Sequence, residues 1–172
     1  MKTTPVTPDD LARSVLAVPP LARHANLTLN HAANKAQIDH LQAGGVRTLM
    51  YGGNANFYNI GTDEYPSLLD MLEKFAAKDT WVIPSIGSDF GKAFDQISIL
   101  RERAFPTAMV LPQAVISTES GIATGIRKLA ERYGKPLIVY IKSDDYLSPK
   151  TVAALDADGC VCAVKYGTIR AD

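Results

Sequence analysis

Short apolar runs alternate with longer amphipathic segments along the whole chain, which is the pattern of an α/β protein. The apolar runs predict strands at 14–22, 46–51, 81–86, 107–111, 136–141 and 161–166. The amphipathic segments between them predict helices at 30–43, 62–77, 89–104, 119–133 and 148–157. Strands and helices that alternate in this way are expected to form a parallel sheet with right-handed crossover connections.

Capping residues and glycines mark the ends of the predicted helices. Asn30 is the expected N-cap of the first helix, and a Gly-Gly pair ends that helix. Thr62 is the expected cap of the second helix. Gly134 is the expected end of the fourth helix, and Ser148 with the proline after it starts the last one.

Two parallel architectures fit this order of elements. An open doubly wound sheet of the flavodoxin type is complete in about five or six strands, whereas a (β/α)8 barrel needs about 250 residues. The chain has 172 residues, enough for one domain with a real core, and this length favours the open sheet. The residues that follow the strands favour the barrel instead. In both architectures, ligands bind at the C-terminal ends of the strands.

The composition narrows the class of partner. Hydrophobic residues make up 47% of the chain, as in an ordinary globular protein, and 18 basic residues balance 18 acidic ones. Without a net field, nucleic acid and membranes are not expected partners, and small neutral or anionic metabolites are. No apolar stretch approaches the ~20 residues of a membrane span, and residues 1–10 lack the apolar segment of a secretion signal. We therefore expect a cytoplasmic protein.

The cysteines and histidines have spacings that argue against metal and redox sites. Cys160 and Cys162 are the only two cysteines, and their spacing is not that of a CxxC motif. We predict that both are core thiols in a reducing compartment. His24, His31 and His40 lack the i, i+4 spacing of a zinc site, so we expect surface or packing roles and no metal.

Lys165 lies in the run 161–166, which otherwise has the composition of a buried parallel strand. Strands covered by helices on both faces are almost continuously apolar, so a lysine there suggests a function. Burial lowers the pKa of a lysine, and a neutral amine is what Schiff-base formation with a carbonyl substrate requires. The alternative is that the strand ends at Val164 and the ammonium group reaches solvent.

Two other strand ends carry candidate chemistry. The turn at 52–56 lets backbone N–H groups approach a ligand, but it matches neither GxGxxG nor GxxxxGK[ST], and a simple tight turn explains it equally well. Tyr140 ends a strand, where its phenol either exchanges protons with a substrate or packs with its hydroxyl satisfied. Lys142 is a second amine close by and a rival nucleophile, although the Ser-Asp-Asp segment after it indicates solvent.

In their order along the chain, these segments resemble the dihydrodipicolinate synthase / N-acetylneuraminate lyase family of Schiff-base-forming lyases. The match runs from about Val15 to the end of the chain. The sequence GGNANFY at 52–58 is similar to the family's GTTGEFY turn, and VKY at 164–166 is similar to its lysine-bearing sixth strand. Tyr140 precedes Lys165 by 25 residues, close to the interval between the family's tyrosine and lysine.

The resemblance implies a (β/α)8 barrel, with about six of the eight strands present in one partial domain that spans 1–172. It implies that Lys165 forms a Schiff base with pyruvate or another 2-oxo acid and that Tyr140 relays the proton. Gly53 and Asn54 stand where the family binds the carboxylate of the 2-oxo acid. The resemblance also implies a homo-oligomer and no cofactor.

The chain departs from the family pattern in four places. Gly53 and Asn54 replace hydroxyl side chains with a backbone N–H and an amide. LPQA at 111–114 lacks the aromatic pair that the synthases share across a subunit interface, and IKS at 141–143 replaces the segment that recognises their second substrate. Asp172 follows Lys165 by seven residues, so the last two strands and the C-terminal helices of a barrel are expected to be missing. The chain is then part of a longer product, is completed by a partner, or is an inactive fragment.

We therefore expect a Schiff-base-forming lyase of the class I aldolase type (an aldolase, synthase or dehydratase) that acts on pyruvate or another 2-oxo acid. Dihydrodipicolinate synthesis itself is not expected. The alternative is a non-catalytic 2-oxo-acid or sugar-acid binding protein, or an inactive fragment of the same fold. An open flavodoxin-like sheet with an unrelated ligand is a third possibility, against which the lack of a phosphate loop argues.

Overall fold

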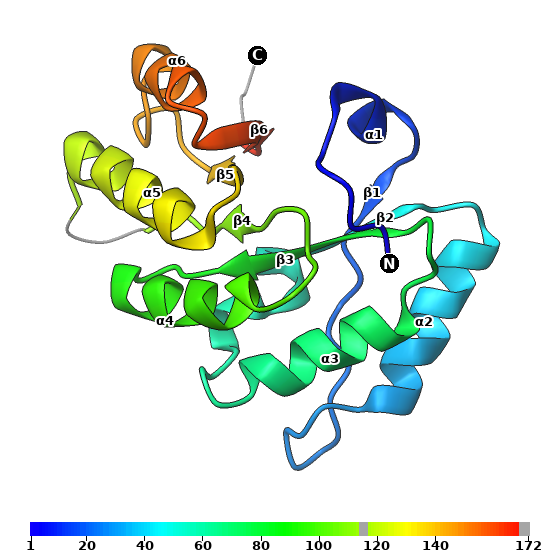
Figure 1. Cartoon of the computed structure of the whole chain (residues 1–172). Helices are drawn as coiled ribbons and strands as arrows, with labels where there is room; N and C mark the ends of the chain where they lie inside the picture. The colour runs from blue at the N-terminus through cyan, green and yellow to red at the C-terminus, as the bar shows by residue number, and fades with distance from the viewer. Residues whose placement is uncertain (114–116, 169–172) are drawn as a thin grey trace. The chain divides into compact units, whose positions relative to one another are not determined.

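Strands and helices alternate along the chain, as the sequence predicts (Figure 1). The computed structural model describes residues 1–113 and 117–168. The strands are β1 (Leu16–Ala17), β2 (Thr48–Tyr51), β3 (Trp81–Ile86), β4 (Met109–Val110), β5 (Leu137–Ile141) and β6 (Val161–Tyr166). The α-helices are α1 (Pro8–Ala12), α2 (His31–Ala43), α3 (Tyr65–Phe75), α4 (Phe90–Arg101), α5 (Glu119–Tyr133) and α6 (Pro149–Ala157). Two 3-10 helices, η1 (Gly53–Ala55) and η2 (Phe57–Asn59), follow β2.

The chain divides into two compact units. The first comprises Met1–Ser85 and Ala104–Pro106, and in it β1 pairs with β2, and β2 with β3, in parallel. The second comprises Ile86–Arg103 and Thr107–Asp172, and in it β4 pairs with β5, and β5 with β6, also in parallel. Parallel pairing of consecutive strands is the arrangement predicted from the alternating pattern. That the chain forms one domain over 1–172 stays a prediction.

Local signals correctly predicted the ends of three helices. The side chain of Asn30 accepts a hydrogen bond from the N–H of Ala33 at 3.0 Å and so caps α2. Gly134 ends α5 in the left-handed region, with φ of 73°. The hydroxyl of Ser148 accepts from the N–H of Thr151 at 3.2 Å at the start of α6.

Other predicted boundaries were wrong. Thr62 does not cap a helix: the N–H of Tyr65 donates to the carbonyl of Thr62, so residues 62–64 form a turn, and α3 begins at Tyr65 with Pro66 in its first turn. The first strand is only Leu16–Ala17 and ends before the prolines at 19 and 20, which have no N–H to donate. The fourth strand is Met109–Val110 rather than 107–111, and the short helix α1 was not predicted.

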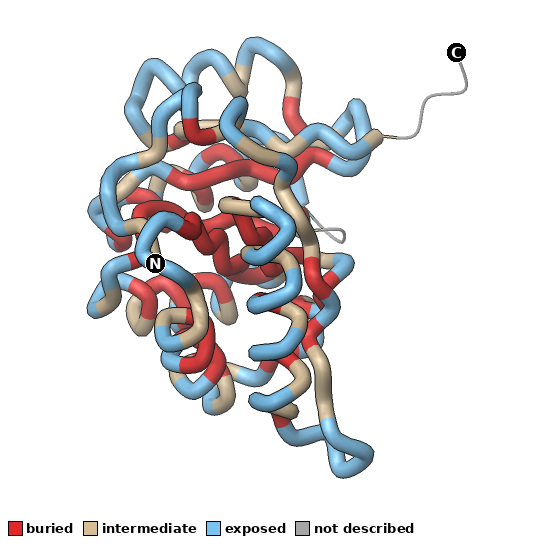
Figure 2. Tube along the Cα trace, turned by 90° about the vertical axis from the view of Figure 1, so that its right-hand side faces the viewer, coloured by how far each residue is buried: buried red, intermediate tan, exposed pale blue. Residues whose placement is uncertain are grey.

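Buried residues gather along the central strands (Figure 2), whereas β1 and β6 are only partly buried. β2, β3 and β5 are buried along their whole length, whereas Val164 and Tyr166 of β6 are 40% and 52% exposed. The expectation that β6 is covered on both faces is therefore wrong. Among the described residues, β6 pairs with β5 on one side only. Cys160 and Cys162 are likewise half-buried rather than core thiols.

The described part of the chain contains no group of three His, Cys, Asp or Glu side chains placed to hold a metal ion. His31 instead packs edge-on against Phe75, with ring centroids 6.4 Å apart. His31 is the first residue of α2, and His40 lies near the end of that helix. His24 lies in the loop before α2. Over the same residues, no helix has the length and apolar character required to cross a membrane.

Candidate active site

Tyr140 and Lys165 are direct neighbours across the ladder between β5 and β6. Each is the next-to-last residue of its strand. Residues in register on adjacent parallel strands point to the same face of the sheet. The two side chains therefore share one face near the C-terminal ends of the strands, which is the end where α/β barrels bind their ligands.

A register shift of the β-bulge type sets this pairing. Leu137 is opposite Val161 but Ile138 is opposite Ala163, which leaves Cys162 as the extra residue of β6. The Sγ atom of Cys162 lies 3.7 Å from the carbonyl oxygen of Leu137. It also lies 3.6 Å from the hydroxyl oxygen of Thr107, two residues before β4. These contacts hold the extra residue in place.

The bulge decides which face Lys165 occupies. Val161 packs in an apolar cluster with Val139. If side chains alternated regularly from Val161, Lys165 would lie on the side of that cluster. Instead Val164 is opposite Val139, and Lys165 is opposite Tyr140. The extra residue therefore turns the lysine toward the tyrosine.

The amine of Lys165 lies over the face of the Tyr140 ring, with Nζ 4.2 Å from the ring centroid. The lysine side chain is half-buried, and the strand continues past it to Tyr166, so the alternative that the strand ends at Val164 is wrong. Loss of hydration on burial lowers the pKa of Lys165, and the nearby charge of Lys142 lowers it further. The ring acts in the opposite direction, since an aromatic face attracts a cation by about 0.5–1 kcal/mol at an exposed site.

Lys142 approaches the same ring from the segment after β5. Its Nζ is 5.7 Å from the centroid of Tyr140, and its side chain is exposed. Both candidate nucleophiles therefore lie beside one phenol. Lys165 is the closer and the less hydrated of the two, which favours it as the nucleophile.

Gly167 was not singled out by any sequence pattern, yet it lies against the edge of Tyr140. A Cβ at Gly167 would be 3.1 Å from Cε2 of Tyr140 and 3.3 Å from its hydroxyl oxygen. The N–H of Gly167 donates to the carbonyl of Ile141 at 2.9 Å, which fixes Gly167 to the end of β5. The hydroxyl of the next residue, Thr168, is buried and has no hydrogen-bond partner among the described residues. Tyr140 thus has an amine on its face and backbone at its edge.

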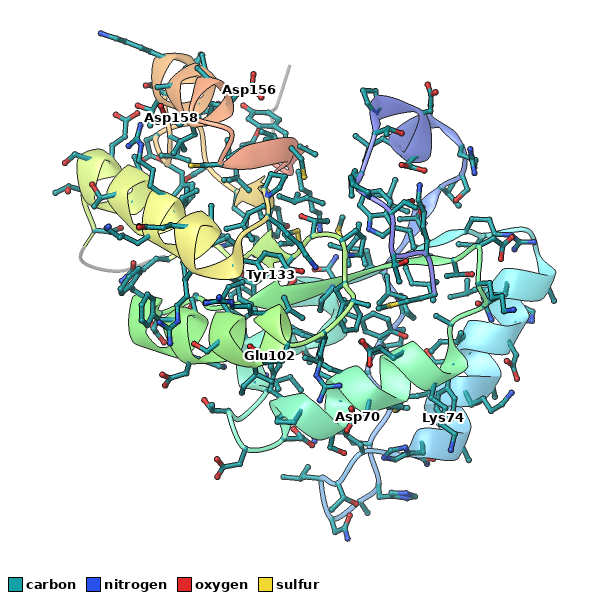
Figure 3. All side chains as sticks on the ribbon, viewed as in Figure 1. Asp70, Lys74, Glu102, Tyr133, Asp156 and Asp158 are labelled. Atoms are coloured by element: carbon teal, nitrogen blue, oxygen red, sulfur yellow. The ribbon has the colours of Figure 1, made fainter. Side chains whose placement is uncertain are left out.

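Helices α5 and α6 are tied together at two points beside these strands. Arg127 of α5 donates at 2.7 Å to Asp158, which caps the C-terminal end of α6. Figure 3 labels Asp158 at this end of the helix. Glu119, the first residue of α5, accepts from the N–H of Ser148 at 2.7 Å and from the hydroxyl of Thr151. Hydrogen bonding by the side chains of Ser148 and Thr151, together with the N–H of Ser148, lowers the pKa of Glu119 to about 2. The loop that carries Lys142 lies between these elements in the sequence.

Gly53 and Asn54 begin η1 in the first unit, directly after β2. A Cβ at Gly53 would be 2.8 Å from Cε2 of Tyr58, so this ring occupies the space that any side chain at position 53 would need. Asn54 is exposed, and neither residue's N–H makes a backbone hydrogen bond within the described part of the chain. The glycine is explained by packing. The predicted binding of a carboxylate here stays a prediction.

Solved structures share this fold at low sequence identity. Dihydrodipicolinate synthase from Bacillus clausii matches with a TM-score of 0.81 at 17% identity, over 92% of this chain and 54% of the other. A prophage protein of the dihydrodipicolinic acid synthase family from E. coli K12, in complex with pyruvate, matches with 0.78 at 18%, over 90% and 54%. A catalytic lysine mutant of Ruminococcus gnavus sialic acid aldolase matches with 0.82 at 10%, over 92% and 54%.

The chain therefore has the fold of the dihydrodipicolinate synthase / N-acetylneuraminate lyase structures, an α/β fold with six parallel strands that corresponds to part of a (β/α)8 barrel. This confirms the fold that the sequence resemblance implied and rejects the open flavodoxin-like sheet. The chain spans about half the length of the solved structures that it matches. No protein-family model and no curated protein matches the sequence.

Proposed function

We propose that this chain carries the Schiff-base centre of a class I aldolase-type lyase that acts on pyruvate or another 2-oxo acid. The observation that carries the proposal is the contact between the half-buried amine of Lys165 and the ring of Tyr140 at the ends of adjacent strands. A desolvated amine next to a second cation is the usual form of an activated lysine nucleophile. The pyruvate in one matched structure and the catalytic lysine named for another support the same class of chemistry.

In the proposed reaction, the neutral amine of Lys165 attacks the keto carbon of the substrate and forms a C–N bond. Tyr140 carries one proton from the nitrogen to the keto oxygen, a second proton comes from solvent, and the oxygen leaves as water. The resulting iminium withdraws electrons from the neighbouring carbon, so that C–C cleavage, condensation or dehydration passes through an enamine. That Gly53 and Asn54 bind the carboxylate of a 2-oxo acid, through a backbone N–H and an amide, stays a prediction from the family resemblance.

Reductive trapping tests the proposal. The protein is incubated with pyruvate and sodium borohydride, and the peptide that contains Lys165 is examined by mass spectrometry. We expect one reduced pyruvate on Lys165 in the wild type, none in K165R because the guanidinium stays charged, and retention of the adduct in K142R. An adduct on Lys142, or no adduct on a folded protein, would contradict the assignment.

A second candidate function is non-catalytic binding of a 2-oxo acid or sugar acid. The observation that favours it is the ring of Tyr58, which fills the position where the family resemblance calls for a hydroxyl side chain. Carboxylate binding through backbone groups alone would hold a ligand without completing a proton relay. A rise in Tm with pyruvate, together with the absence of any borohydride-trapped adduct, would identify this function.

A further inference from the structure

Two lysine amines share one tyrosine ring in the second unit. Nζ of Lys165 is 4.2 Å from the centroid of Tyr140, and Nζ of Lys142 is 5.7 Å from the same centroid. Because both distances are measured to the same point, the two nitrogens are separated by at most the sum of these distances. An aromatic face attracts one ammonium group, but a second ammonium beside it adds like-charge repulsion.

The two amines differ in their access to water. The side chain of Lys142 is exposed, whereas that of Lys165 is half-buried and has lost part of its hydration. Burial disfavours the charged form of an amine. Burial and the repulsion therefore act in the same direction on Lys165, and both favour the loss of its proton.

We propose that Lys142 is a positioning residue for the Schiff-base chemistry of Lys165: its ammonium group, held beside the same ring, disfavours a second positive charge and keeps the Lys165 amine neutral and nucleophilic. This inference rests on the proposed function and gives Lys142 a role other than that of the nucleophile. It also gives a physical reason for a lysine at this position, in the segment IKS at 141–143 that departs from the family pattern.

The other titratable groups near Lys165 do not replace Lys142 in this role. Tyr166 follows Lys165 on the strand but points to the opposite face, and its hydroxyl donates to the carboxylate of Asp144. Asp145 is exposed in the same loop. Helix α6, with its own charged residues, packs through Leu155 in the apolar cluster on that opposite face. Burial is the main cause that lowers the pKa of Lys165, and the charge of Lys142 is the second cause.

The test measures the titration of Lys165 itself. The full chain is labelled with a trace of acetic anhydride from about pH 6 to about pH 11, a range that spans the ordinary pKa of lysine, and the Lys165 peptide is quantified by mass spectrometry. K142Q removes the charge, and K142R keeps it. K150Q is the matched control, because Lys150 is an exposed lysine of α6 in the same unit.

We expect K142Q to move the titration of Lys165 to higher pH and to slow its labelling near pH 7 by about two- to fivefold, the effect of removing one charge across a partly hydrated gap. K142R and K150Q should leave the titration unchanged. The effect of K142Q should shrink in ~1 M salt, where the Debye length is about 3 Å, which a purely structural role would not predict.

An unchanged titration of Lys165 in K142Q, or an equal shift in K150Q, would overturn this role for Lys142. The labelling uses no pyruvate and depends only on the two amines. Failure of borohydride trapping would therefore refute the proposed function and leave the labelling result standing, so the two hypotheses fail separately.

Discussion

Replacement of Gly53 by alanine tests whether packing against Tyr58 fixes the glycine in the turn after β2. A Cβ at this position would be 2.8 Å from Cε2 of Tyr58, closer than side-chain carbons pack, so the ring must move. The backbone itself does not require glycine, because Gly53 is not among the residues with positive φ. Gly61, a few residues later, has no atom within 4 Å of an added Cβ and provides the matched control.

The magnitude follows from this contrast. Extra methyl groups in packed sites cost typically about 1–3 kcal/mol. Tyr58 is half-buried rather than enclosed, so we expect the cost at position 53 to lie near the lower end of that range. Alanine in place of glycine also restricts the unfolded chain, which stabilises a protein by about 0.4–1 kcal/mol in both variants. G61A should therefore be at least as stable as the wild type, and G53A should be about 1–2 kcal/mol less stable than G61A.

Urea unfolding, followed by far-UV circular dichroism, measures this difference. A double-mutant cycle with Y58A isolates the contact, because the cost of G53A should disappear once the ring is removed. If G53A unfolds at the same urea concentration as G61A, or if its cost persists in the Y58A background, the ring of Tyr58 is not what excludes a side chain at position 53.

Three further predictions concern the second unit. Hydrogen bonds from Ser148 and Thr151 lower the pKa of Glu119 from an ordinary 4.5 to about 2, so its carboxylate stabilises the fold above pH 4.5 and loses this effect as the pH falls toward 2. The Tm difference between wild type and E119Q should shrink over that window, and a constant difference would contradict this prediction. Y140F keeps the ring beneath the amine but removes the hydroxyl, so it should fold normally and slow pyruvate trapping by about 10²–10⁴-fold, whereas unchanged trapping would exclude a proton relay. G167A places a methyl group 3.1 Å from the Tyr140 ring and should slow trapping several-fold by displacing the phenol, with acetylation of Lys165 as the control for its accessibility.

Elements set by local chemistry could be predicted from the sequence. Asn30 and Ser148 cap their helices through side-chain oxygens a few residues away from the N–H groups that they satisfy, and Gly134 adopts the left-handed conformation that ends a helix. Thr62 has the same capping chemistry, but the prediction that it caps a helix was wrong. Pro66, which suits the first turn of a helix, lies further along the chain, and α3 starts next to it.

The candidate site depends on tertiary features that no local pattern encodes. Lys165 and Tyr140 were predicted from their places in apolar strands and from the family resemblance. Their contact, however, requires the bulge at Cys162, and a bulge leaves no mark on the alternation of a nearly all-apolar strand. The edge of the tyrosine ring against Gly167 joins residues from two strand ends. The burial of β6 was overestimated because an apolar composition does not say whether a neighbouring strand is present.

The bulge also means that the number of residues within β6 is constrained more tightly than their identity. One insertion or deletion between Val161 and Lys165 would exchange the two faces of the strand and carry the amine to the side of the apolar cluster. Changes of length in the loop at 142–147 would leave that count intact. In sequences descended from this one, gaps should therefore be tolerated in the loop and eliminated by selection inside the strand.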